Sequence, residues 1–154
     1  MRSEGTFGRG VEEVKDVRAA LGRAQMEAPG PVFLCGWSFG AHVALRTAPD
    51  EERVAALGLV ALPLHESGPD LPDLPRFPSP ERLASFDRPV LLLAGDHDPY
   101  CPVPELLVIA GRIPASTVEI VSRANHYFAQ REREAGRIVA EFAERSVGGS
   151  PGAQ

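Results

Sequence analysis

The sequence has fewer basic than acidic residues, and its basic residues form no cluster. Its 154 residues include 16 Lys and Arg against 21 Asp and Glu, a formal net charge of −5, and the single lysine is Lys15. Nucleic acids and anionic membranes are bound by concentrated positive charge. We therefore expect neither a nucleic acid nor a membrane as a partner.

Long apolar runs and cysteines are also scarce. No run reaches the ~18 apolar residues of a spanning helix, and the N-terminal segment MRSEGTFGRG has no apolar stretch typical of a signal peptide. The only cysteines, Cys35 and Cys101, lie in an apolar run and in a proline-containing loop. These absences predict a cytoplasmic protein with two reduced thiols.

The apolar segments that are present are short and alternate in type. Segments of strand length occupy 31–35, 54–62, 89–95 and 116–121, and helical patterns occupy 11–26, 39–48, 81–86, 104–112 and 127–146. Strands and helices that alternate in this way predict an α/β fold, a three-layer parallel sheet with helices on both faces. We expect one domain over 1–147 and a disordered tail over 148–154.

The first predicted helix carries its apolar residues near one face. These are Val11, Val14, Val17, Leu21 and Ala24. The segment APGP should end this helix.

Groups that can do chemistry follow three of the four predicted strands. Ser38 lies in CGWSFG after the first strand, Asp96 and Asp98 lie in AGDHDPYCP after the third, and His126 lies in SRANHYF after the fourth. Because the carboxyl ends of parallel strands meet at one edge of a sheet, we expect these loops to converge. A Gly-x-Ser-x-Gly match alone is weak, so this shared context carries the interpretation.

The chain order Ser, Asp, His, with each residue after its own strand, resembles the α/β-hydrolase superfamily. GWSFGAHVALR is similar to its nucleophile elbow and the helix that follows, LLLAGDHDPYCP to its acid strand, and ANHYF to its histidine loop. The nearest likeness is to small bacterial serine hydrolases of the dienelactone-hydrolase-like kind, with little or no lid. The resemblance implies the C-terminal part of that fold and hydrolysis of small acyl esters.

The resemblance assigns roles that suit each residue type. Ser38 would be the nucleophile, His126 its base, and Asp98 the carboxylate that orients the imidazole, with Asp96 as the less favoured alternative. The backbone N–H of Phe39 would donate to the developing oxyanion, and Trp37 and Phe39 would line the pocket, although packing against helices explains both equally well. Gly36 and Gly40 would keep side chains out of a sharp turn. No cofactor is implied.

The remaining histidines and the second thiol are expected to play no part. We predict that His42 lies on a helix surface and that His65 belongs to a proline-rich loop. His97 has no ligand cluster of metal-binding spacing beside it, so no metal is expected. Cys101, outside the elbow, is not a nucleophile candidate.

The sequence departs from the family pattern before the elbow. In the fold that it resembles, four strands and a second oxyanion donor precede the elbow strand, and no segment of this sequence matches them. Strand 31–35 should then form an apolar sheet edge through which the chain self-associates. Three hypotheses follow: a serine hydrolase whose recorded start is too late, a catalytically weak or inactive hydrolase-like protein, or a binding and interaction module.

Overall fold

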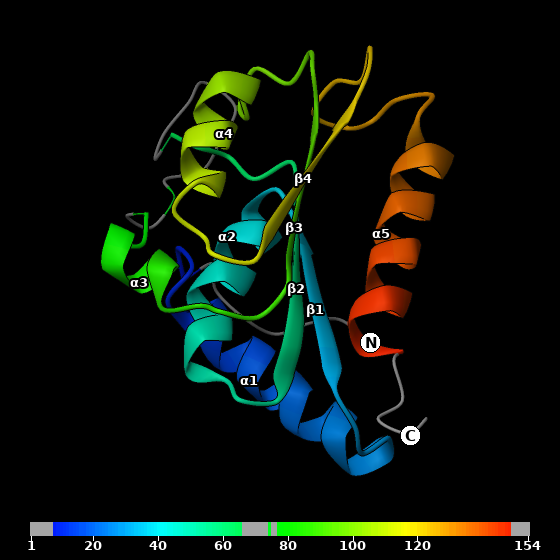
Figure 1. The fold of residues 1–154 in the computed structure, drawn as a ribbon. Coiled ribbons are helices and arrows are strands. Elements are labelled where there is room, and N and C mark those ends of the chain that lie inside the picture. The colour runs from blue at the N-terminus through cyan, green and yellow to red at the C-terminus, as the bar shows by residue number, and fades with distance from the viewer. Residues whose placement is uncertain (1–7, 66–73, 75–76, 149–154) are drawn as a thin grey trace.

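The computed structural model describes residues 8–65, 74 and 77–148, and its centre is one parallel sheet (Figure 1). The four strands lie in the order β1-β2-β3-β4. Their bounds are Val32–Trp37 for β1, Val54–Val60 for β2, Val90–Gly95 for β3 and Ser116–Val121 for β4. Parallel pairing throughout confirms the predicted fold class.

Helices cover both faces of the sheet, which makes three layers. One face carries α1 (Glu12–Glu27), α2 (Phe39–Thr47), α3 (Pro80–Ala84) and α4 (Val103–Ala110). Of the described helices, α5 (Glu132–Val147) is the one that covers the other face (Figure 1). A short 3₁₀ helix, Ala48–Asp50, extends α2. No helix in the described part of the chain is long and apolar enough to cross a bilayer.

The core divides into two clusters because the sheet is apolar on both faces. All six residues of β3 are buried, as expected for an inner strand covered on both sides. Leu92 packs with Leu106 and the helices of the first face, while Leu91 and Leu93 pack with Phe142 of α5.

Two helices differ from the sequence-based prediction. The helix predicted over 127–146 begins only at Glu132, because Phe128 and Gln130 have φ angles of 52° and 65° and the chain there forms turns. In α1 only Leu21 is buried, and Val11 is 55% exposed. Of the five apolar residues expected near one face, Leu21 is thus buried, whereas Val11 and Ala24 are exposed.

The predicted tail, 148–154, lies outside the described residues except for Gly148. That glycine ends α5 and donates its N–H to the carbonyl oxygen of Glu144.

β1 forms one edge of the sheet, opposite β4. Among the described residues it pairs with β2 alone. It contains no charged residue, and Cys35 and Trp37 are exposed. Strand edges of this kind pair readily with other chains.

We expect residues 1–154 alone to self-associate through β1, because the edge presents unpaired backbone groups without a charge to block them. Cys35→Lys should shift sedimentation in reducing buffer toward the monomer. Thr117→Lys, at an exposed position of the opposite edge strand β4, is the matched control and should have little effect. A wild-type chain that stays monomeric at high concentration would contradict this expectation.

Candidate active site

Ser38 occupies a tight turn between β1 and α2. Its backbone has φ 53° and ψ −121°, a conformation that residues other than glycine rarely adopt. The Ser38 N–H donates to the carbonyl oxygen of Val60 at 2.9 Å, and its own carbonyl accepts the N–H of Ala41 at 2.9 Å. Both sides of the turn are thus held by hydrogen bonds to β2 and α2.

The turn also needs a glycine two residues earlier. A Cβ on Gly36 would lie 2.1 Å from the carbonyl oxygen of Gly40, so β1 and α2 can approach only without a side chain there. A Cβ on Gly40 would have no neighbour within 4 Å. The prediction that both glycines relieve crowding holds for Gly36 and is wrong for Gly40, whose missing side chain faces open space.

Asp98 lies in the turn after β3 and is 4% exposed. Its Oδ1 accepts the N–H of Tyr100 at 2.9 Å, and its Oδ2 lies 2.9 Å from Nδ1 of His126. Asp96, by contrast, is exposed and accepts the hydroxyl of Ser122 at 3.3 Å. Of the two aspartates, the structure therefore brings Asp98 to the histidine.

His126 joins the other two groups. It is 5% exposed, and its Nε2 lies 2.8 Å from Oγ of Ser38. Because the Asp98 carboxylate only accepts hydrogen bonds when ionised, we assign the imidazole proton to Nδ1, which leaves Nε2 to accept the Ser38 hydroxyl. The three side chains form one continuous series of hydrogen bonds, which we call the Ser38–His126–Asp98 chain.

The loops after β3 and β4 are fastened together, which sets the position of His126 relative to Asp98. The N–H of His97 donates to the carbonyl oxygen of Ala124 at 2.9 Å. A Cβ on Gly95 would lie 2.2 Å from that same oxygen, so the strand end must be glycine. This close backbone contact, together with the hydrogen bond from Ser122 to Asp96, holds the loop of the acid beside the loop of the histidine.

Three aromatic rings surround the imidazole of His126. The ring centroids of Tyr100, Tyr127 and Trp37 lie 4.9, 5.4 and 5.7 Å from it. The Nε1–H of Trp37 also donates to the carbonyl oxygen of His126 at 3.2 Å. The sequence analysis named Trp37 but missed both tyrosines, whose only signal is their place beside Asp98 and His126.

Phe39 is half-buried and is the first residue of α2. Its backbone N–H therefore belongs to a helix N-terminus, where amide dipoles favour negative charge. It directly follows Ser38, as the sequence analysis expected of an oxyanion donor.

His42 and His65 have hydrogen-bond or ion-pair partners outside the Ser38–His126–Asp98 chain, and the predicted exposure of His42 is wrong. His42, expected on a helix surface, is 1% exposed, and its Nε2 lies 2.7 Å from the carbonyl oxygen of Pro63. The segment after β2 covers α2 there, and Phe77 stands edge-on to the His42 ring. His65 faces Glu105 instead.

The described residues include two cysteines and no cluster of possible metal ligands. In residues 8–65, 74 and 77–148, no three His, Cys, Asp or Glu side chains are grouped closely enough to hold a metal ion. Cys101 is fully buried, and burial, with the charges of Asp98 and Glu105, raises the pKa of its thiol to about 12. A protonated, enclosed thiol is a poor nucleophile. Cys35, on β1, is exposed.

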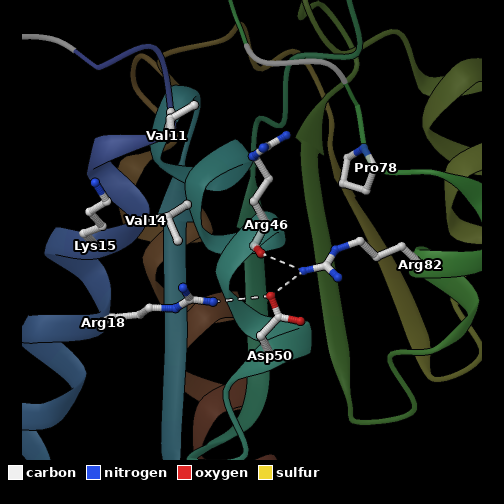
Figure 2. A pocket seen from close by; sticks show the side chains of 9 residues that line it. Val11, Val14, Lys15, Arg18, Arg46, Asp50, Pro78 and Arg82 are labelled. Carbon is white, nitrogen blue, oxygen red and sulfur yellow. Dashed lines mark hydrogen bonds and ion pairs between the residues drawn. The ribbon is translucent and has the colours of Figure 1, made fainter.

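A separate cavity of about 420 Å³ lies among α1, α2 and α3 (Figure 2). Ser38, His126 and Asp98 do not line it. Arg18 and Arg82 reach across it from opposite walls to Oδ2 of Asp50, at 3.3 and 2.7 Å. The hydrogen bond from Arg82, assisted by the charges of Arg82 and Arg18, lowers the pKa of the Asp50 carboxyl. These ion pairs join α1 to α3 through the 3₁₀ helix that follows α2.

Comparison with known proteins identifies one family. The family described as an alpha/beta hydrolase domain matches residues 9–147. No curated protein matches the chain at a significant level.

Solved structures show the same likeness. An alpha-beta serine hydrolase homologue from Coxiella burnetii is 27% identical, with a TM-score of 0.73 over 92% of this chain and 63% of that one. A serine hydrolase without a lid from Xanthomonas campestris is 21% identical, with a TM-score of 0.75 over 98% and 64%. An esterase from Pyrococcus furiosus is 19% identical, with a TM-score of 0.79 over 95% and 66%. The chain thus spans 63–66% of the length of these three proteins.

Gly36→Ala and Gly40→Ala form a matched test of the turn. The first substitution forces a methyl group into backbone atoms and should lower the free energy of unfolding by about 1–3 kcal/mol or more. The second adds a methyl group in open space on a helix and should leave stability unchanged or raise it by up to about 1 kcal/mol. Urea denaturation measures both, and equal effects would contradict the close approach at Gly36.

The ion pairs of Asp50 with Arg18 and Arg82 predict that the free energy of unfolding depends on pH. Since its folded pKa is lowered, the ionised Asp50 stabilises the fold above the ordinary aspartate pKa of about 3.9, and this contribution disappears as pH falls through the folded value. Because all three side chains are 40–47% exposed, Asp50→Asn should cost less than about 1 kcal/mol at pH 7.

Urea denaturation between pH 7 and pH 3 measures the difference in stability between the wild type and Asp50→Asn. This difference should be constant down to about pH 4 and shrink below it. High salt should also reduce it. Asp16→Asn, at an exposed position of α1, is the control and should change stability less. A loss for Asp50→Asn that ignores both pH and salt would mean that packing, and not charge, is what Asp50 contributes.

Proposed function

The chain belongs to the family of alpha/beta hydrolase domains, and from that premise we propose that it is a serine hydrolase that cleaves small acyl esters through an acyl-enzyme. The observation that carries the proposal is the Ser38–His126–Asp98 chain, with contacts of 2.8 and 2.9 Å between its members. This is the arrangement that activates a serine hydroxyl, a weak nucleophile by itself.

In the first half of the reaction, Nε2 of His126 takes the proton of the Ser38 hydroxyl as Oγ attacks the ester carbonyl carbon. The carbonyl oxygen becomes an oxyanion, which accepts the N–H of Phe39 at the start of α2. The tetrahedral intermediate then collapses, and the bond to the alcohol oxygen breaks. His126 delivers its proton to that oxygen, which leaves the acyl group on Ser38.

In the second half, a water molecule replaces the alcohol. His126 removes a proton from the water, whose oxygen attacks the acyl carbon, and the bond to Ser38 Oγ breaks as Oγ regains the proton. The carboxylic acid leaves, and the enzyme returns to its starting state. Asp98 stays ionised throughout, holding the tautomer of His126 and stabilising the imidazolium.

The small size of the proposed substrate follows from the sequence. Its short connection over 63–86 is typical of hydrolases with little or no lid, although 66–73 and 75–76 lie outside the described residues. The half-exposed ring of Trp37 next to Ser38 is consistent with an open site. We propose that the reaction needs no cofactor and takes place in the cytoplasm.

We expect Ser38 of the purified chain to react with a fluorophosphonate probe and to support slow hydrolysis of a short activated ester. Ser38→Ala should abolish labelling. Asp98→Asn should lower kcat about 10³–10⁴-fold, since an asparagine favours the wrong tautomer of His126. Labelling followed by mass spectrometry and ester turnover measure these effects.

Asp96→Asn is the matched control, because Asp96 lies in the same turn but contacts Ser122 instead of His126. It should keep nearly wild-type activity. If the folded chain neither labels nor hydrolyses any of a panel of short esters, the hydrolase proposal fails, and a binding module becomes the better account.

A further inference from the structure

Two large aromatic side chains stand exposed beside the site. Trp37 is 48% exposed and Tyr127 is 66% exposed, and their ring centroids lie 5.8 Å apart at an interplanar angle of 63°. Aromatic rings usually bury most of their surface, so an adjacent exposed pair points to a ligand.

Hydrogen bonds hold the ring of Trp37 and the backbone of Tyr127 in place. Trp37 donates its Nε1–H to the carbonyl oxygen of His126 at 3.2 Å, and the N–H of Tyr127 donates to Oδ1 of Asn125 at 3.0 Å. Trp37 directly precedes Ser38, and Tyr127 directly follows His126. The pair is therefore a surface held at the elbow and at the histidine loop at once.

The position of the pair identifies the part of the ester that it meets. In the proposed reaction His126 gives its proton to the oxygen of the leaving alcohol, so the group on that oxygen must lie beside the imidazole. Trp37 and Tyr127 are the two exposed rings that contact this imidazole, at 5.7 and 5.4 Å between centroids. The alcohol part of the ester therefore lies against them.

We propose that Trp37 and Tyr127 form an aryl-binding surface for the alcohol part of the ester, which makes arylmethyl esters the preferred substrates. This inference rests on the proposed hydrolase function. Aromatic pairs in tilted or edge-to-face contact improve affinity roughly 2- to 12-fold beyond their buried area. A cationic alcohol is disfavoured, because His126 itself becomes positively charged as the reaction proceeds.

Binding can be measured without turnover, because the chain contains a single tryptophan, Trp37. In the Ser38→Ala variant, benzyl acetate should quench tryptophan fluorescence at lower concentration than cyclohexylmethyl acetate, which has similar size but no aromatic ring. Adding Tyr127→Ala should weaken benzyl acetate binding roughly 2- to 12-fold, whereas Tyr127→Phe should preserve it. Leu107→Ala, which removes a side chain 53% exposed on α4, is the control and should change nothing.

Steady-state kinetics provide a second test of the aryl-binding surface. The ratio of kcat/KM for benzyl acetate to that for cyclohexylmethyl acetate should exceed one in the wild type and fall toward one in Tyr127→Ala. If Ser38 labels with fluorophosphonate but the two esters bind and react alike, the aryl-binding surface is wrong while the hydrolase proposal stands. If Ser38 does not label yet benzyl acetate still quenches Trp37 selectively, the rings bind aryl groups, but the hydrolase proposal fails and with it the assignment of this surface to the leaving alcohol.

Discussion

The positive φ of Ser38 is the constraint on which the rest of this site depends. A backbone held at φ 53° and ψ −121° costs on the order of 1–3 kcal/mol, and it persists because β2 and α2 both bind the turn. Gly36 removes the one side chain that would push β1 and α2 apart. This strained turn aims Oγ of Ser38 at the imidazole of His126.

The parallel sheet supplies the other half of the geometry. The carboxyl ends of β1, β3 and β4 lie at the same end of the sheet. The residues that follow them, Ser38, Asp98 and His126, therefore meet there although 28 to 88 residues separate them in sequence. β2 lies between β1 and β3 and supplies the carbonyl oxygen of Val60 that holds the elbow. The glycine at the end of β3 lets the histidine loop approach closely.

Much of this was predictable because strong local signals agree with the fold. The four apolar runs specified the strands, and the loops that follow them specified which side chains meet. Other features depend on tertiary contacts that leave no periodic signal. The burial of His42 requires the segment after β2 to cover α2, and the late start of α5 requires positive φ angles at Phe128 and Gln130. Tyr127 gains its place only because the histidine loop turns beside Trp37.

The most direct test of the central claim is which ring nitrogen of His126 carries the proton in the neutral imidazole. ¹⁵N NMR of the side chain, assigned with a His126→Gln variant, reads this tautomer without substrate or turnover. The account predicts a proton on Nδ1, donated to Asp98, and a bare Nε2 facing Ser38. A proton on Nε2 would contradict it, because that nitrogen could then not accept the proton of the serine.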